Sequence, residues 1–215
     1  MSQTKPTKRK YDSSRRKQQA RETQRQIVAA ARELFITYGY AGTTIEAIAQ
    51  KANVAIETIY ATFGNKRNIL VRVVDVSVTG DDEPVPLLER PQVKAVEAES
   101  NPKLQIQMFA SQITEIMTRV APLFQVMRTV AKTEPEIAHI LEGLLSGRLQ
   151  GMEHFVGALA QYGSLRAGLD EHTTIETVWV LTSAEVYNLL TLDRGWSSER
   201  YEQWLVEMLN RHLLP

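Results

Sequence analysis

The sequence predicts an all-α protein with a small N-terminal helical domain and a larger C-terminal one. Apolar residues recur at helical spacing along most of the chain, and no segment alternates apolar and polar residues as a half-buried strand does. Helix-breaking residues cluster over 80–86, GDDEPVP, and mark the boundary between the two parts. We therefore expect a flexible basic arm over 1–20, a helical domain over 21–80 and a second helical domain over 81–215.

The N-terminal part carries four apolar patterns of helical period. The first runs from Arg21 to Gly39, and the next three cover about 45–52, 54–63 and 66–78. The apolar positions of the first two patterns are Ile27, Ala31, Leu34, Phe35, Tyr38, Ile45, Ile48, Ala49 and Ala52. A turn of only a few residues separates the second pattern from the third, which is the spacing of a helix-turn-helix unit.

The C-terminal part predicts five helices, at about 102–119, 122–131, 135–162, 173–191 and 197–213. Residues 87–101 are acidic and poorly periodic, which predicts a partly ordered loop. Gly143, Gly147 and Gly151 fall on one face of the third helix, although each glycine weakens a helix by ~1 kcal/mol relative to alanine. They indicate either close packing against a neighbouring helix or room for a ligand.

The charge is divided unevenly along the chain. Residues 1–80 hold 14 Lys or Arg against 6 Asp or Glu, whereas residues 81–215 hold 11 against 19. The basic half suits a polyanionic partner, and chance scatter of surface charge is the alternative. Residues 1–19 carry seven Lys or Arg, one Asp and no large aliphatic residue, which is typical of a flexible basic arm.

Several classes of protein are excluded by composition. The chain has no cysteine, so it has no disulfide, no thiol nucleophile and no cysteine-ligated metal. The four histidines are not spaced as ligand pairs, and no nucleophile–base motif is present. We therefore expect no metal, no cofactor, no catalytic residue and no enzymatic activity. No signal peptide or membrane-length apolar segment is found, which predicts a cytoplasmic protein without a membrane partner.

The segment VAIETIYATFGNKR, residues 54–67, predicts a short helix with two different faces. Val54, Ile59 and Phe63 form a packing face, and the opposite face suits the major groove of DNA. The candidates for the groove and its walls are Ala55, Ile56, Glu57, Thr58, Ala61 and Thr62. The candidates for phosphate contacts are Thr43, Thr44, Tyr60 and Lys66. Each of them carries a hydroxyl group or lies near a helix N-terminus.

The ordered pattern over residues 24–70 resembles the N-terminal domain of the TetR family of transcriptional regulators. The matching residues are Ile27, Ala30, Ala31, Leu34, Phe35, Gly39, Tyr40, Thr43, Thr44, Ile48, Ala49, Ala52, Val54, Thr58, Tyr60, Phe63 and Lys66. The C-terminal segments LTSAEVY (181–187), RGWS (194–197) and YEQWL (201–205) also resemble the end of many such regulators. Residues 81–172 carry no recognisable motif.

The resemblance implies a homodimer with a three-helix DNA-binding domain and a larger helical domain for ligand binding and dimerisation. Such a protein usually represses transcription from a near-palindromic operator and is released by a small-molecule effector. Two departures from the family pattern are an alanine at position 55, where a capping serine is common, and small residues at Ala61 and Thr62. They predict sparse hydrogen bonding to bases. A helical enzyme or small-molecule carrier with an incidental basic face is the alternative.

The effector is expected to be largely apolar, because the C-terminal helices offer mainly apolar side chains for a pocket. The candidate ligand-binding residues, which are first of all core positions, are Phe109, Ile113, Met117, Phe124, Met127, Leu144, Met152, Phe155 and Trp179. The sequence does not separate pocket from core among them.

The dimer is predicted to form through the last two helices, 173–191 and 197–213, as a four-helix bundle. The residues assigned to this face are Val178, Leu181, Ala184, Tyr187, Asn188, Thr191, Tyr201, Trp204, Leu205, Met208 and Leu209.

The basic residues Arg15, Arg16 and Lys17 precede the first predicted helix. They either read an adjacent A·T-rich minor groove or add non-specific attraction to DNA.

Overall fold

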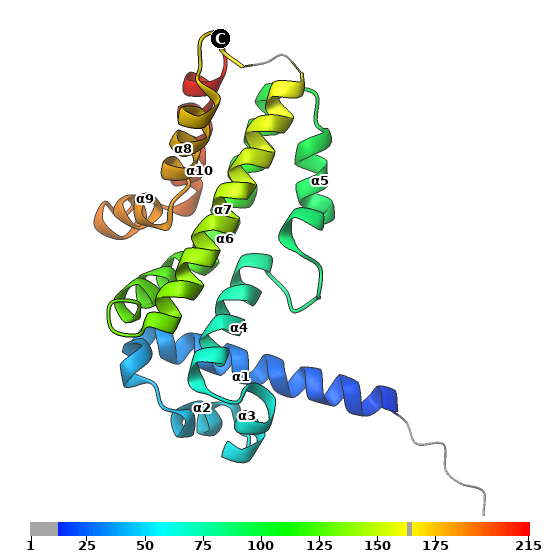
Figure 1. Ribbon diagram of the computed structural model, residues 1–215, viewed down its shortest axis with the longest axis vertical. Helices are drawn as coiled ribbons and strands as arrows, with labels where there is room; N and C mark the ends of the chain where they lie inside the picture. Colours follow the sequence, from blue (N-terminus) through cyan, green and yellow to red (C-terminus); the bar gives the residue numbers. More distant parts are fainter. Residues whose placement is uncertain (1–12, 163–164) are drawn as a thin grey trace, which may run out of the picture.

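The computed structural model describes residues 13–162 and 165–215, and this part of the chain is helical without strands, which confirms the predicted fold class (Figure 1). The N-terminal helices are α1 (Ser13–Gly42), α2 (Ile45–Ala52), α3 (Ile56–Phe63) and α4 (Lys66–Thr79). They are followed by the 3-10 turn η1 (Leu87–Glu89), α5 (Pro91–Ala98), α6 (Pro102–Val130), α7 (Pro135–Gln161), α8 (Glu171–Leu181), α9 (Ala184–Asn188), the π-helical turn η2 (Leu189–Asp193) and α10 (Ser198–Leu213). Among these described helices, none is long and apolar enough to cross a membrane.

The N-terminal helices share one core, as the apolar patterns predict. Each helix contributes side chains with no exposed surface: Ile27 and Phe35 from α1, Ile48 from α2, Ile59 from α3 and Ile69 from α4. In Figure 1, α2 and α3 lie together at the end of the molecule opposite the C-terminus, and α1 crosses beside α4. Burial of these side chains fixes the orientation of the short α3, which is too short to be stable alone.

Helix α1 differs from the prediction at both ends. It already includes residues 13–20, so the expected flexible arm is wrong there, because Arg, Lys, Gln and Ala are good helix formers and no Gly or Pro interrupts them. Residues 1–12 lie outside the described part. At the other end Gly39 has φ 70° and ψ 176°, which breaks the helix. Consequently Tyr38 is exposed, against expectation, and Tyr40 is buried and stacks on Phe35.

Helix α6 is the central element, since it packs against α1, α4, α5, α7, α9 and α10. The predicted division into helices 102–119 and 122–131 is wrong, because α6 continues through Pro122. A proline inside a helix removes one backbone hydrogen bond and costs about 3 kcal/mol in isolation. Buried neighbours, among them Ala121, Leu123 and Phe124, offset that cost by packing.

The predicted helix 173–191 is interrupted after Leu181. The Thr182 hydroxyl donates to the Val178 carbonyl, and the Ser183 hydroxyl accepts from the Val186 amide as the N-cap of α9. These two hydroxyl groups satisfy main-chain groups at the break, which apolar periodicity does not indicate. Helices α7 and α10 agree with the predicted ranges to within one residue.

The predicted dimer face is wrong for six of its residues, which are buried within the single chain: Val178, Ala184, Tyr187, Tyr201, Leu205 and Leu209. The reason is the packing of α9 and α10 against α6, which takes the apolar face of both helices into the monomer core. The Tyr201 hydroxyl also donates to the Leu181 carbonyl at 3.2 Å.

The segment 87–101 is more ordered than predicted. Pro91 begins α5, and Val96 is buried against the core, but eight residues are too few for a clear periodic signal. Two ion pairs hold the connection between α4 and α5. Arg90 donates to both carboxylate oxygens of Asp81 at 2.6 and 2.8 Å, and Arg25 of α1 donates to both oxygens of Asp82 at 3.0 and 2.8 Å.

Candidate nucleic-acid interface and ligand cavity

Helix α3 presents one face to the core and the other to solvent. Ile59 has no exposed surface, and Val54 and Phe63 are partly buried against the core, as predicted. The opposite face exposes the predicted groove candidates Ala55, Ile56, Glu57 and Ala61, together with Tyr60, which is 51% exposed. The turn before α3 is set by Asn53, a left-handed residue (φ 54°) whose amide donates to the Gln50 carbonyl.

The polar groups of α3 are few. Ala55 occupies the N-cap position in an extended conformation and supplies no side-chain cap, whereas an N-cap hydrogen bond is worth about 1 kcal/mol. Thr62 donates its hydroxyl proton to the Thr58 carbonyl at 2.7 Å, so this donor is already used inside the helix. Glu57 and Thr58 carry the side chains best able to bond to base edges.

The two threonines before α2 have different surroundings. Thr43 is 1% exposed and donates to the Gly39 carbonyl at 2.8 Å, so its prediction as a phosphate contact is wrong. Its hydroxyl instead satisfies a carbonyl released where α1 breaks. Thr44 is exposed at the N-cap of α2, where its oxygen accepts from the Ala47 amide and its hydroxyl proton is left for another acceptor.

Lys66 has a structural role that the sequence does not reveal. Its ammonium donates to the carbonyls of Tyr40 and Thr43 at 2.8 and 2.9 Å and lies 4.2 Å from the centre of the Tyr40 ring. Partial burial lowers the pKa of this ammonium. Lys66 therefore joins the start of α4 to the turn between α1 and α2, and one of its three N–H groups is left for a phosphate.

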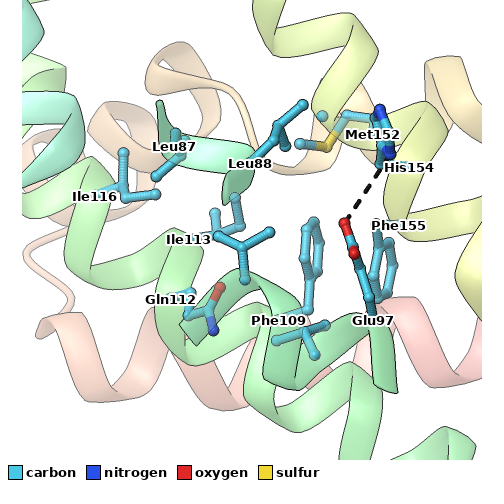
Figure 2. A pocket seen from close by; sticks show the side chains of 13 residues that line it. Leu87, Leu88, Glu97, Phe109, Gln112, Ile113, Ile116, Met152, His154 and Phe155 are labelled. Carbon is cyan, nitrogen blue, oxygen red and sulfur yellow. Dashed lines mark ion pairs between the residues drawn. The ribbon is translucent and has the colours of Figure 1, made fainter. Parts of the chain in front are cut away.

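An apolar cavity of about 70 Å³ lies between α5, α6, α7 and η1 (Figure 2). Its walls are Leu87, Leu88, Val93, Val96, Glu97, Phe109, Gln112, Ile113, Ile116, Gly151, Met152, His154 and Phe155. The rings of Phe109 and Phe155 stack with centroids 3.6 Å apart and planes 7° apart. Figure 2 shows Glu97 and His154 facing each other beside these rings.

The cavity brings together four of the predicted ligand residues, namely Phe109, Ile113, Met152 and Phe155. Five others lie elsewhere: Met117 and Met127 are core residues, Phe124 lines a shallow surface groove, and Leu144 and Trp179 are partly buried away from the cavity. Helical periodicity marks the inward face of a helix but not which inward residues border a void.

Most of the missed lining residues come from 87–97, the segment predicted as a loop. Two signals there point to a buried wall: the apolar pair Leu87 and Leu88, and the i,i+3 pair Val93 and Val96 after Pro91.

The three glycines of α7 differ in their position relative to the cavity. Gly151 lines the cavity, whereas Gly143 and Gly147 do not, and no described atom lies within 4 Å of a Cβ built on any of them. Close helix packing within the chain is therefore not their role.

Three polar contacts join the N-terminal helices to the C-terminal helices. Arg67 of α4 pairs with Glu136 of α7 at 3.0 Å. Arg119 of α6 donates to the Ser77 carbonyl of α4 at 2.9 Å, and Arg32 of α1 donates to the Arg119 carbonyl at 3.0 Å. These contacts tie α6 and α7 to α1 and α4, which share a core with α3.

Residues 27–73, which span α1 to α4, match the family model described as "Bacterial regulatory proteins, tetR family". The N-terminal helices of the chain therefore form a TetR-family DNA-binding domain. TetR-family members are DNA-binding regulators, so the prediction that this chain is not an enzyme is confirmed. The comparison with curated proteins gives no match.

Solved structures share the TetR-family fold over most of the chain. A putative TetR-family regulator from Mesorhizobium loti is 18% identical, with a TM-score of 0.67, and covers 91% of this chain and 98% of its own. FadR from Bacillus subtilis in complex with stearoyl-CoA is 21% identical, with a TM-score of 0.68, and covers 86% and 96%. A regulator from Saccharomonospora viridis in complex with choline is 18% identical, with a TM-score of 0.69, and covers 91% and 99%.

Proposed function

We propose that this TetR-family regulator is a homodimeric repressor that binds a near-palindromic operator and is released by a small-molecule effector. The observation that carries the proposal is the placement of α3, whose inner face is locked by Ile59 and whose outer face is exposed. A helix held in this way fits the major groove of DNA. Binding to chromosomal DNA places the protein in the cytoplasm.

Contacts to DNA divide into two groups in this proposal. Glu57 and Thr58 reach base edges, and Ala61 meets a thymine methyl group. Thr44, Tyr60 and the remaining N–H group of Lys66 contact phosphates, and the free amides at the start of α2 add to them. Because few side chains of α3 can make two bonds to one base, phosphate contacts supply most of the affinity and DNA shape supplies part of the specificity.

The effector site in this proposal is the cavity between α5, α6 and α7. Two of its walls lead to the DNA-binding helices. Leu87 and Leu88 lie between Asp81 and Arg90, whose ion pair closes the connection after α4, and α6 contacts α1 and α4 directly. Relatives of the same fold are bound to stearoyl-CoA, choline or triclosan. These ligands differ in size and charge, so the lining residues have to define the effector of this chain.

The homodimer is proposed from the family, with a surface different from the one the sequence indicates. The apolar side chains exposed near the C-terminal helices are Val180, Leu189 and Leu192, at 50%, 56% and 65% exposure. Gly143 and Gly147 lie on an open face of α7, which α8 flanks. Sedimentation should show a dimer at micromolar concentration, and a monomer there would contradict this part of the proposal.

The proposed function is tested by a mobility shift with the intergenic DNA upstream of the gene and with a random duplex of equal length. The protein should bind the upstream DNA at least tenfold more tightly. The double variant Glu57→Ala and Thr58→Ala should remove this preference, because it removes the polar groups facing bases. Glu142→Ala, an exposed carboxylate on α7, is the matched control and should change neither affinity. Equal binding to both duplexes would refute sequence-specific regulation.

A further inference from the structure

The polar groups at the cavity include one carboxylate and no Lys or Arg. Glu97, Gln112 and His154 are the polar side chains among the thirteen described lining residues, and none of the thirteen is Lys or Arg. One N–H of the Gln112 amide donates to the Gln92 carbonyl at 2.6 Å, and its second N–H and its oxygen remain. Among the lining residues, the charge that a ligand meets is therefore the negative charge of the Glu97 carboxylate.

Glu97 is incompletely satisfied. Its Oε2 atom accepts from Lys94 at 2.8 Å, but its Oε1 atom is buried and has no hydrogen-bond partner among the described residues. The His154 Nδ1 atom lies 4.0 Å from Oε1, which is too far for a hydrogen bond. The Lys94 side chain is 55% exposed, so solvent screens its ion pair. A buried carboxylate oxygen without a donor favours a ligand that supplies one.

A second, open groove continues from the same two residues. It has a volume of about 430 Å³ and is lined by Glu97, Glu153, His154, Gly157, Ala158 and Gln161. This lining also contains no Lys or Arg, and it adds a second carboxylate at Glu153. Glu97 and His154 thus stand between an enclosed apolar space and an open acidic one, so one ligand can place different groups on their two sides.

The size of the enclosed part limits the apolar group. Its volume of about 70 Å³ is roughly half that of an engineered 150 Å³ cavity that binds benzene. It accommodates a short alkyl segment as it stands, and a longer chain requires Met152 or the stacked Phe109 and Phe155 rings to move. Met152 is suited to such movement because its unbranched side chain has three rotatable bonds.

We propose that the effector is a lipophilic cation, an alkyl or aralkyl ammonium compound whose tail enters the cavity and whose ammonium group binds Glu97. This inference rests on the proposed function, since it names the class of ligand for the same site. The ammonium supplies the donor that Glu97 Oε1 lacks, and Glu153 adds attraction from the open groove. A fatty acid or an acyl phosphate would bring a negative charge to two carboxylates, which is unfavourable.

The test uses three probes with the same eight-carbon tail and different head groups: octylammonium, octanol and octanoate. Binding to the full-length protein is measured by calorimetry at pH 7 and constant ionic strength, below the concentration at which each probe aggregates. Octylammonium should bind about tenfold or more tightly than octanol, which is the effect expected for one hydrogen bond to a charged group. Octanoate should bind more weakly than octanol.

The variant Glu97→Gln keeps the shape of the side chain and removes its charge. It should reduce octylammonium affinity about tenfold while octanol affinity changes less than twofold, so that the preference between the two is lost. Glu176→Gln is the matched control, because Glu176 also faces a histidine, His172, at 3.7 Å on an exposed helix surface. This control should keep the wild-type preference.

Equal affinity for octylammonium and octanol, tighter binding of octanoate, or an unchanged preference in Glu97→Gln would overturn the inference. Binding is measured without DNA, so these outcomes do not depend on operator recognition. A separate mobility shift with saturating octylammonium tests release from DNA. Failure of the protein to bind upstream DNA refutes the proposed function alone, and failure of the head-group preference refutes this inference alone.

Discussion

Lys66 provides the sharpest test of how the DNA-binding helices are held. Two readings compete: a clamp on the carbonyls of Tyr40 and Thr43, and a phosphate anchor. In Lys66→Met the side chain keeps most of its length but loses its charge and its N–H donors. If Lys66 acts as a clamp, Lys66→Met should lower the free energy of unfolding in the absence of DNA. If Lys66 anchors a phosphate, the operator affinity of Lys66→Met should depend less on salt concentration.

The magnitude follows from the geometry. Two hydrogen bonds of 2.8 and 2.9 Å from a charged donor contribute about 1.5–3 kcal/mol each when buried, and the cation–π contact with Tyr40 adds about 0.5–1 kcal/mol. Lys66 is only partly buried, and water can solvate the released carbonyls. We therefore expect Lys66→Met to lower the free energy of unfolding by about 2–3 kcal/mol, which is less than the lower end of that sum.

The measurements are urea unfolding followed by circular dichroism and operator affinity across a range of salt concentrations. Lys51→Met is the control, since the Lys51–Glu33 ion pair is exposed and should be worth less than about 1 kcal/mol. A contribution of Lys66 to phosphate binding would flatten the slope of log affinity against log salt by about one. An unchanged unfolding midpoint together with a flatter slope would refute the clamp.

Three further changes test other parts of the structure. Gly147→Ala should weaken the dimer in sedimentation, because Gly147 lies on the open α7 face proposed for the partner and an added Cβ meets no described atom of its own chain; an intact dimer with an unfolding free energy raised by up to about 1 kcal/mol would show that no partner packs closely on this face. Arg90 lowers the pKa of Asp81 from 3.8 to about 2, so the stability that Asp81 contributes is present above pH 4 and lost as the pH falls through 2. Asp81→Asn should remove this part of the acid dependence in unfolding curves between pH 2 and 6, and an identical dependence would contradict the assignment. Tyr201→Phe should cost about 1 kcal/mol in thermal or urea unfolding through loss of the bond to the Leu181 carbonyl, and an unchanged midpoint would count against that bond.

The helix-turn-helix could be predicted from the sequence because its determinants are local. Apolar spacing placed Ile59 inward, and Asn53 and Gly64 sit at the ends of α2 and α3, where their positive φ angles fit. The role of Lys66 could not be predicted in this way. Its partners lie 26 and 23 residues away, and only the tertiary fold brings these carbonyls to the ammonium.

The cavity shows the same limit. Phe109 and Met117 both lie on the inward face of α6, but of these two only Phe109 borders the void. The positions of Leu87 and Glu97 depend on the Arg90–Asp81 clamp, a contact between residues in a segment without periodicity. The dimer face was misassigned for a related reason: an apolar stripe such as Tyr201 and Leu205 does not state whether it meets its own chain or another.

Pro122 divides α6 into two arms that work against different neighbours. The arm before it carries Phe109 and Ile113 at the cavity, and the arm after it carries Val126 and Val130, which line a groove shared with Tyr40. The nine residues from Pro122 to Val130 span roughly 13 Å of helix. A change of about 5° in the bend at the proline would then swing the far end of the helix by about 1 Å. A small change in the bend at Pro122 would therefore leave the packing beside the cavity intact. The same change would displace the end of α6 near Val130 by a distance comparable to the tolerance of a hydrogen bond.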